Sequence, residues 1–245
     1  MTADWLALLD YGTFEVAEDG RRIPIRGYVV RSGEHVVLVD TGFPHAYYED
    51  AEEAGRLDGL DAFGHLVSIG PQNRPQEQLA LLGLASGDVT KLVLTHGDID
   101  HVGGMHHFPD ATLVMSSAER RAGPPRYYGD LRPLEWPTNT HSRDVDGDEE
   151  IAPGLTLLAT PGHSPGHLSL LVELAETGTV ILACDAISRE HEVATGVNGG
   201  SSDDEAARRS ANRLVELADE RRALLVYGHD PEQSRTLRRA PETYR

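Results

Sequence analysis

The chain has 245 residues, of which 39% are hydrophobic and 25% are charged, a composition typical of a folded domain that excludes a disordered or fibrous protein. Asp and Glu number 40 against 22 Lys and Arg, so the formal net charge is -18. Because such a chain repels phosphate groups, we expect no nucleic acid and no anionic membrane among its partners.

The N-terminal segment and the cysteine content bear on the compartment. Residues 1–10 lack a basic region and their apolar run ends at Asp10, which disfavours a signal peptide. No apolar run approaches the length of about 18 residues that a membrane span needs. The single cysteine, Cys184, excludes an intrachain disulfide. We therefore expect a cytoplasmic protein.

Short apolar runs, separated by turn residues, predict most of the strands. Residues 25–31 and 35–39 are predicted to form a hairpin around Ser32-Gly33-Glu34. Further strands are predicted over 91–95, 112–115, 155–159, 168–172, 179–183 and 223–227.

Helical patterns lie between some of these strands. Residues 75–82 start with a proline and are followed by a glycine, and residues 202–222 carry capping residues and apolar residues at helical spacing. Residues 122–154 are rich in proline and acidic residues and predict a long irregular segment. The loose alternation favours an α/β or α+β fold with helices covering sheet faces.

Four potential metal ligands fall within six positions directly after the strand predicted over 91–95: His96, Asp98, Asp100 and His101. Imidazole and carboxylate groups are first-rank ligands for divalent metals. Without a cation, this loop would crowd carboxylates together at an electrostatic cost. The stretch therefore predicts a metal site.

Three more candidate ligands follow predicted strands: His163, Asp185 and His229. Strand ends are rigid positions, as a preorganised site requires. Of the remaining histidines, His167 either packs in the interior or supports a ligand from behind. We expect Cys184 to pack as a small apolar residue.

These residues together resemble the signature of the metallo-β-lactamase superfamily, H-x-H-x-D-H followed by a single His, a bridging Asp and a last His. The intervals of 62, 22 and 44 residues between His101, His163, Asp185 and His229 resemble the N-acyl-homoserine lactonase branch, whose activity is quorum quenching. Asp40, in Asp40-Thr41-Gly42, matches the superfamily's first motif, whose Asp supports the ligands from behind.

The resemblance implies one domain over residues 1–245, an αββα sandwich of two facing mixed sheets with helices outside. It implies that His96, Asp98 and His163 bind one divalent metal and that Asp100, His101 and His229 bind another, with Asp185 as the bridge. Variable segments near 43–75 and 122–150 are expected to cover the mouth of the site and to supply an apolar wall from Tyr47, Tyr48, Phe63, Tyr127, Tyr128 and Trp136.

Two positions depart from the lactonase pattern. Asp98 replaces the second His of the signature, which makes the site harder and favours Mn²⁺ or Fe²⁺ beside the Zn²⁺ that the resemblance implies. Alternatively, Asp98 turns away and leaves one metal. Ser188 replaces a tyrosine that contacts substrate in the lactonases, and Tyr127 or Tyr128 is the candidate substitute.

The implied reaction is hydrolysis of a small ester, best a lactone, through attack of a metal-bridging hydroxide on a metal-polarised carbonyl. Asp100 is the candidate for carrying the proton to the leaving oxygen.

Three alternative functions stay open. The first is a thioester hydrolase of glyoxalase II type, with Arg235, Arg238 and Arg239 as candidate glutathione contacts. The others are an iron-dependent oxidoreductase acting on oxygen or sulfur species and a non-catalytic metal-binding module. A homodimer is expected on general grounds, because symmetric dimers are the commonest assemblies of soluble proteins.

Overall fold

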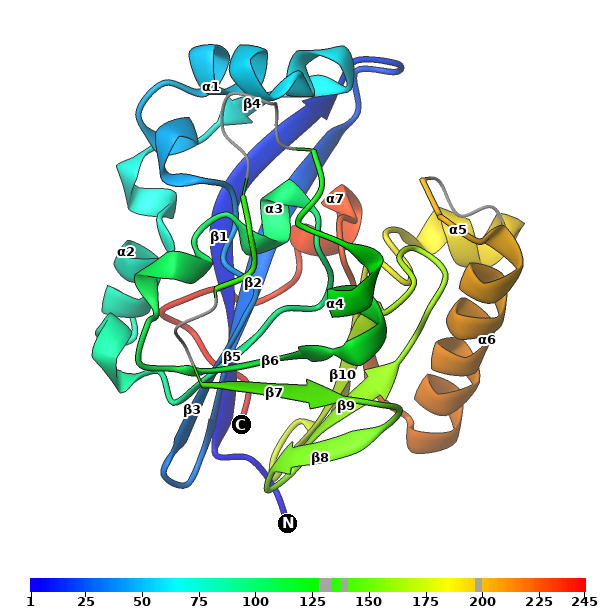
Figure 1. Cartoon of the computed structure of the whole chain (residues 1–245). Coiled ribbons are helices and arrows are strands. Elements are labelled where there is room, and N and C mark those ends of the chain that lie inside the picture. Colours follow the sequence, from blue (N-terminus) through cyan, green and yellow to red (C-terminus); the bar gives the residue numbers. More distant parts are fainter. Residues whose placement is uncertain (128–133, 138–140, 197–199) are drawn as a thin grey trace.

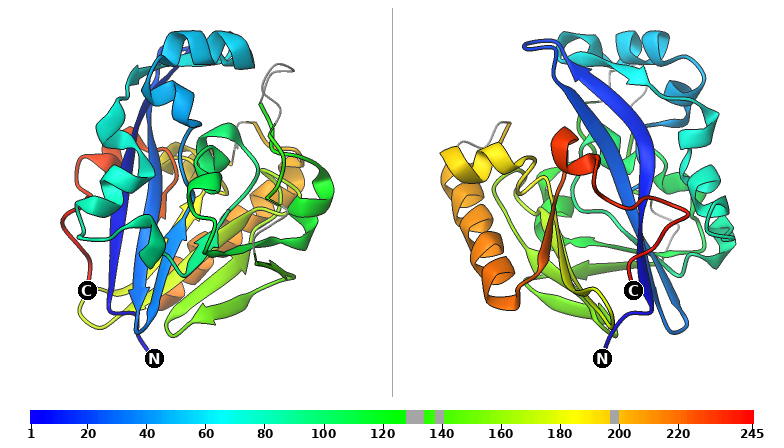
Figure 2. Two further views of the ribbon diagram at one scale, coloured as in Figure 1. Left: turned by 60° about the vertical axis from the view of Figure 1, so that its left-hand side comes forward. Right: turned by 180° about the vertical axis from the view of Figure 1, so that it is seen from behind.

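The computed structural model describes residues 1–127, 134–137, 141–196 and 200–245. Two β-sheets face each other in the described part, with helices outside both (Figures 1 and 2). The first sheet has the order β4 (Gly64–Ser68), β1 (Trp5–Val16), β2 (Arg22–Ser32), β3 (His35–Val39), β5 (Lys91–Val93), β6 (Thr112–Ser116) and β7 (Ser142–Val145). The second has the order β12 (Leu224–Tyr227), β11 (Gly178–Cys184), β10 (Leu168–Leu174), β9 (Leu155–Ala159) and β8 (Glu149–Ala152).

The helices lie on the two outer faces. Along the first sheet run α1 (Ala51–Asp58), α2 (Pro75–Ala80), α3 (Ile99–Val102) and α4 (Ser117–Ala122). Beside the second sheet lie α5 (Glu190–Thr195) and the long α6 (Asp204–Arg221), and α7 (Pro231–Ser234) follows β12. Figure 2 shows α6, in orange, against the outside of the second sheet, and both termini at the same end of the molecule.

Strand alternation divides the apolar interior into layers, because successive side chains of a strand point to opposite faces. In β11, Val180 and Leu182 belong to the core between the sheets, whereas Ile181 and Ala183 pack outward with Leu214 of α6. A third core joins the outer face of the first sheet to its helices. Helix, sheet, sheet and helix thus form the predicted αββα sandwich.

Most predicted elements are present. The sequence patterns do not predict the long strand β1, whose apolar run is broken at Asp10. The structure accommodates that break with a β-bulge between Asp10 and Gly12, where Gly12 has a φ of 115°. Within the segment predicted to be irregular, β7 and β8 add an edge strand to each sheet. Cys184 is buried in the core between the sheets, as predicted.

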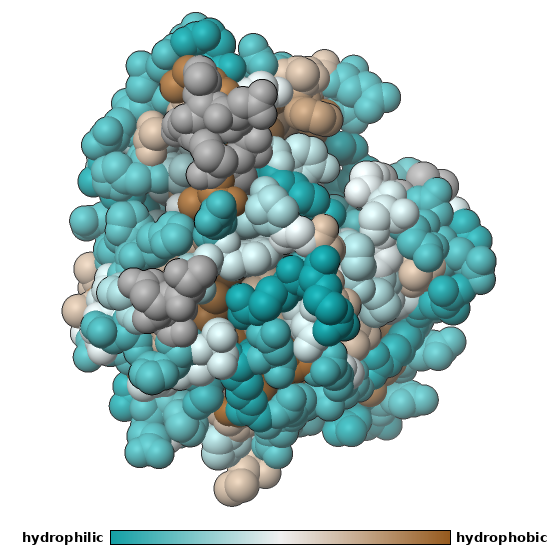
Figure 3. All heavy atoms as spheres, in the orientation of Figure 1, coloured by the Kyte–Doolittle hydropathy of each residue, from teal (hydrophilic) through white to brown (hydrophobic). Residues whose placement is uncertain are grey.

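The face seen in Figure 3 is mostly hydrophilic, with small apolar patches, in keeping with the high net charge. Among the described residues, none of the helices combines the length and the hydropathy that crossing a bilayer requires.

Two parallel strand pairs bring their carboxyl ends to one edge of the sandwich. The strands β3 and β5 run parallel in the first sheet, and β11 and β12 run parallel in the second. The residues that follow these four strands include Asp40, His96, Asp185 and His229. The backbone turns sharply at two of these ends, since Asp40 and Cys184 have φ of 58° and 49°. Left-handed non-glycine residues of this kind are uncommon and cluster at functional sites.

Candidate metal centre

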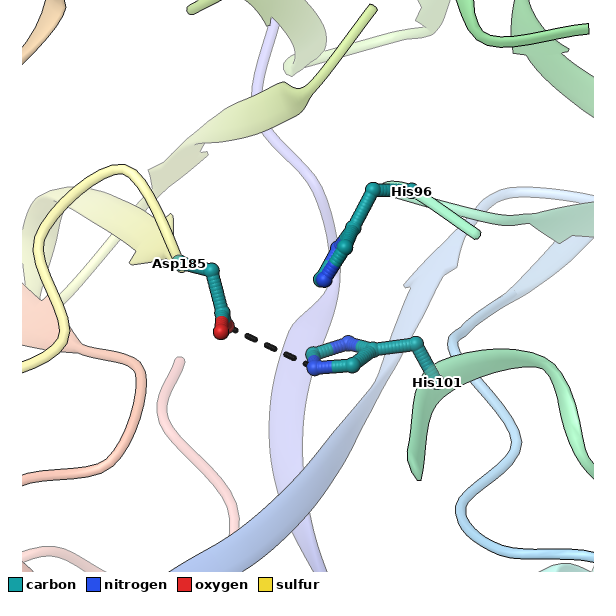
Figure 4. Close-up of side chains that lie close together, drawn as sticks. All are labelled: His96, His101 and Asp185. Atoms are coloured by element: carbon teal, nitrogen blue, oxygen red, sulfur yellow. Dashed lines mark ion pairs between the residues drawn. The ribbon is translucent and has the colours of Figure 1, made fainter. Parts of the chain in front are cut away.

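All seven predicted ligands come together at this edge. His96 and Asp98 lie in the loop after β5, Asp100 and His101 lie on α3, and the others follow β9, β11 and β12. Their donor atoms form three groups, in each of which all atoms lie within 4.8 Å of one another: His96, His101 and Asp185; His96, Asp98 and His163; and Asp100, His101 and His229. In Figure 4 the Asp185 carboxylate faces the imidazoles of His96 and His101 from the opposite sheet.

The first half-site consists of His96, Asp98 and His163. Asp98 Oδ2 lies 3.2 Å from His163 Nε2 and 3.5 Å from His96 Nε2. One carboxylate oxygen and two imidazole nitrogens therefore converge on a single position. Asp98 therefore faces the cluster and does not turn away from it, as the alternative for this position would require.

The second half-site consists of Asp100, His101 and His229. Asp100 Oδ2 lies 3.5 Å from His101 Nε2 and 3.8 Å from His229 Nε2. Asp185 stands between the half-sites, with Oδ1 at 3.4 Å from His101 Nε2 and Oδ2 at 3.2 Å from His229 Nε2. The same Oδ2 lies 3.7 Å from His163 Nε2 in the first half-site. This placement is the one that a bridging carboxylate needs.

The three carboxylates make the cluster attract positive charge. Burial by itself lowers the pKa of His229, but the carboxylates of Asp185 and Asp100 together outweigh burial and raise that pKa to about 9. Burial likewise opposes protonation of His101, whose pKa is nevertheless raised well above its ordinary value by Asp100, Asp40 and Asp185. A cation among these groups satisfies the same electrostatic demand.

Four buried donor or acceptor atoms in the cluster make no hydrogen bond: His96 Nε2, Asp98 Oδ1, His101 Nε2 and Asp185 Oδ1. Buried polar atoms are normally paired, so an unpaired set gathered in one cluster requires an explanation. Imidazole nitrogens and carboxylate oxygens are ligands that Zn²⁺, Mn²⁺ and Fe²⁺ accept. The residues present therefore fit divalent metal ions.

The Asp40-Thr41-Gly42 turn holds the second half-site from behind. Asp40 Oδ2 accepts a hydrogen bond from His101 Nδ1 at 2.8 Å, which leaves Nε2 to face the cluster. Thr41 contributes its backbone N–H and its hydroxyl, both of which donate to the His101 carbonyl. Thr95 donates its hydroxyl to Asp40 Oδ2, so the same hydroxyl accepts from His96 Nδ1 at 3.0 Å. Two imidazoles are thus oriented by one buried carboxylate.

The remaining ligands are also held by hydrogen bonds. His229 Nδ1 donates to the Pro24 carbonyl on β2 at 2.9 Å. The backbone N–H of Asp185 donates to His167 Nε2 at 3.1 Å, while His167 Nδ1 lies 2.9 Å from the Thr160 hydroxyl. Burial and the neighbouring His96 hold the pKa of His167 well below its ordinary value, consistent with an imidazole that accepts. His167 therefore supports Asp185 from behind.

Sequence reasoning missed Glu119 on α4, which is 3% exposed. Its Oε1 accepts from the backbone N–H of Gly97 at 2.9 Å. Its Oε2 accepts from the Ser164 hydroxyl at 2.6 Å and from the Gly166 N–H at 3.0 Å. One carboxylate thereby joins the loop of His96 and Asp98 to the loop of His163. Glu119 matches no motif, and only its contacts with residues distant in the sequence reveal its role.

A pocket of about 360 Å³ opens onto the cluster. Its polar lining residues include Asp98, Asp100, Asp185 and the predicted substrate contacts Tyr127 and Ser188. Tyr128 lies outside the described residues. Its apolar lining residues are Phe14, Ile23, Ile25, Phe43, Leu60, Phe63 and Ile99.

The predicted aromatic wall is only partly found. Phe63 and Tyr127 line the pocket, with their rings edge to face at 5.5 Å. Tyr47 and Tyr48 are instead buried, and Trp136 packs beside Gly97 and donates to the Gly123 carbonyl. Phe14 and Phe43 take their place, because β1 and the turn after β3 reach the pocket.

Comparison with known proteins agrees with this geometry. The model of the metallo-β-lactamase superfamily matches residues 21–229. An N-acyl homoserine lactonase of Bacillus cereus is 31% identical over 221 residues, covering 90% of this chain and 86% of the relative. The lactonase AttM of Rhizobium radiobacter is 32% identical over 183 residues, covering 69% and 68%.

Solved structures give the same result. The structure of an N-acyl homoserine lactone hydrolase, with the product N-hexanoyl-L-homoserine bound at its catalytic metal centre, has a TM-score of 0.85 at 27% identity and covers 100% of both chains. A Bacillus thuringiensis AiiA variant with N-decanoyl-L-homoserine bound has a TM-score of 0.84 at 27% identity, again covering 100% of both chains. With its fold, its ligand cluster and these relatives in agreement, the chain belongs to the metallo-β-lactamase superfamily.

Proposed function

We propose that the protein is a dinuclear metal-dependent hydrolase that opens a lactone, with an N-acyl homoserine lactone as the first candidate. The observation that carries the proposal is Asp185, whose carboxylate lies within 3.7 Å of imidazoles from both half-sites. The lactonase relatives, at about 30% identity over most of the chain, support the substrate class. His96, Asp98 and His163 would hold one ion, Asp100, His101 and His229 the other, and Asp185 both.

The residues divide the chemical work. When bound, two divalent cations supply a hydroxide nucleophile near neutral pH and polarise the substrate carbonyl. Asp100 lines the pocket as well as the second half-site, so its carboxylate can take a proton and deliver it to the leaving oxygen. Burial and the nearby Asp98 raise the pKa of Tyr127, so the phenol stays protonated and can donate to a substrate oxygen.

The pocket suits an ester with an apolar tail. Phe14, Phe43 and Phe63 stand among its apolar lining residues, while Asp98, Asp100 and Asp185 of the ligand cluster are among its polar ones. An acyl chain on the apolar side would bring a lactone carbonyl to the cluster. Ser188 lines the same pocket but donates its backbone N–H to Glu192 at 2.8 Å, so its hydroxyl is the group available to substrate.

The thioester alternative loses support. Arg235 and Arg239, the candidate glutathione contacts, line a different hollow with Asp10 and Arg22. Both are engaged in ion pairs, Arg235 with Glu232 at 2.6 Å and Arg239 with Asp10 at 3.3 Å. The third, Arg238, lies over the ring of Tyr244.

The finer assignments are proposals of the same kind. Zn²⁺ is the first candidate for both ions, and Asp98 makes Mn²⁺ or Fe²⁺ the alternatives. A single domain, a cytoplasmic location and a homodimer stay predictions from the sequence.

A lactone panel tests the proposal. Metal-replete protein is mixed with short- to long-chain acyl homoserine lactones and simple γ- and δ-lactones, and proton release is followed near neutral pH. We expect chelator-sensitive ring opening that survives exchange between Zn²⁺ and Mn²⁺. Activity that requires iron and consumes oxygen would instead establish the oxidoreductase, and no opening by a two-metal protein would refute the lactonase.

A further inference from the structure

One cation stands directly against the metal ligands. Arg126 Nη2 lies 2.5 Å from Asp98 Oδ1. The other oxygen, Asp98 Oδ2, is the one that faces His163 and His96. The two oxygens of Asp98 therefore have different partners, one the guanidinium and the other the ligand cluster.

Arg126 is fixed where it stands. Its backbone N–H donates to the carbonyl of Gly97 at 2.7 Å, which ties it to the loop between His96 and Asp98. Its Nη2 also lies 3.8 Å from Glu119 Oε1, the atom that accepts from the Gly97 N–H. The side chain of Arg126 is 35% exposed and that of Asp98 11%. The pair is thus partly shielded from solvent and screened less than a surface ion pair.

The position of this pair coincides with the departure from the superfamily signature. A carboxylate in place of the second His adds one negative charge to the first half-site. It also adds a second oxygen that can bind a metal or stay free. Arg126 offsets that charge and occupies that oxygen. An imidazole at position 98 would have neither the charge nor the spare acceptor, and the guanidinium would then keep only its 3.8 Å contact with Glu119 beside a cation.

We propose that Arg126 is a positioning and charge-compensating residue of the first half-site, which holds Asp98 to one ligating oxygen and lowers the affinity of that half-site for divalent metal. The inference rests on the proposed dinuclear centre but not on the lactone substrate. Asp98 and Arg126 form one functional unit, so the effect of replacing one of them on metal affinity depends on whether the other is present.

A double-mutant cycle on metal binding tests this unit. Metal-free wild type, R126M, D98H and D98H/R126M are titrated with Zn²⁺ and with Mn²⁺ against a chromophoric chelator, and the bound metal is counted by elemental analysis. R126M exposes the second oxygen and removes a positive charge, so we expect the weaker of the two sites to bind Mn²⁺ about tenfold more tightly. D98H leaves Arg126 with only its longer contact to Glu119, so we expect the Zn²⁺ affinity of D98H at that site to be about tenfold below that of D98H/R126M.

Two controls separate this effect from general disruption. R126K keeps the charge and is expected to stay within about threefold of wild type. R120M breaks a similar pair, Arg120 with Asp144 at 2.8 Å, on the neighbouring α4 and is expected to leave both metal affinities unchanged. Circular dichroism and thermal unfolding of the metal-free proteins identify any variant that does not fold, and R126K against R126M then remains as a comparison.

The outcomes are distinct. Additive effects around the cycle, or equal affinities for R126K and R126M, would overturn the role of Arg126 while leaving the metal centre intact. A wild-type chain that binds no metal would overturn the centre and this inference together. Two bound ions with no lactone activity would refute the proposed substrate. The double-mutant cycle on metal affinity would still test the role of Arg126.

Discussion

Glu119 provides the sharpest test of how the centre is held together. Its carboxylate accepts three hydrogen bonds, from the Gly97 N–H, the Ser164 hydroxyl and the Gly166 N–H. The change E119Q keeps the size and shape of the side chain. It removes the charge and replaces one acceptor oxygen with an amide group that can only donate.

The cost follows from the number of donors that lose their acceptor. A hydrogen bond to a charged group contributes about 1.5–3 kcal/mol, and an unsatisfied buried donor costs about 1–3 kcal/mol. If the amide nitrogen takes the place of Oε1, the Gly97 N–H loses its partner; if it takes the place of Oε2, the Gly166 N–H loses its partner and the Ser164 hydroxyl must turn to accept. We therefore expect E119Q to lower the free energy of unfolding by about 2–4 kcal/mol, and E119A by more.

Urea unfolding of the metal-free protein measures this loss, and a chelator titration measures metal affinity. We expect the first half-site to lose affinity more than the second, because Glu119 joins the loops of His96 and His163 and contacts neither His101 nor His229. The control is E173Q on β10, where Glu173 accepts from Thr179 at the opposite end of β11 from Asp185. If E119Q changed the free energy of unfolding by less than about 0.5 kcal/mol, or lowered the metal affinity of both half-sites equally, the reasoning would be refuted.

Four further predictions follow from other parts of the centre. D185A should remove most of the bound metal and nearly all activity, and full metal retention in elemental analysis would show that the bridging assignment is wrong. D40N leaves one imidazole without its carboxylate partner and should weaken metal binding about 10- to 100-fold in a chelator titration. G228A places a Cβ 2.5 Å from the Cys184 carbonyl oxygen, so it should lower the melting temperature and the metal content, and an unchanged melting curve would count against this close packing. F63A opens the apolar wall and should raise KM for long-chain lactones more than for short ones, with kcat nearly unchanged; equal effects would mean that Phe63 does not touch the acyl chain.

The ligands could be predicted from the sequence because their signal is local. His96, Asp98, Asp100 and His101 fall on one short loop and the helix that follows it, where spacing alone reveals them. The strands that precede His163, Asp185 and His229 are short apolar runs with little ambiguity. The sandwich then follows from the family resemblance, which includes the order of the motifs.

What supports the ligands could not be predicted, because it depends on contacts between distant residues. Glu119 is 45 residues from Ser164, and Phe14 reaches the pocket only because β1, interrupted by a bulge at Asp10, continues as a strand. Tyr47 illustrates the opposite case. It lies in a segment expected at the mouth, but its ring packs in the core and its hydroxyl donates to Asp58.

The two half-sites are alike in their ligands but not in what stands behind them. Each has two imidazoles and one aspartate, and both share Asp185. Behind the second half-site, the Asp40 carboxylate accepts from His101 and makes that imidazole a stronger electron donor. Behind the first, the Arg126 guanidinium draws charge away from Asp98. Only the first half-site has a cation directly against its carboxylate, so the two sites should bind metal unequally, and the second half-site should fill first and keep its metal longest under chelation.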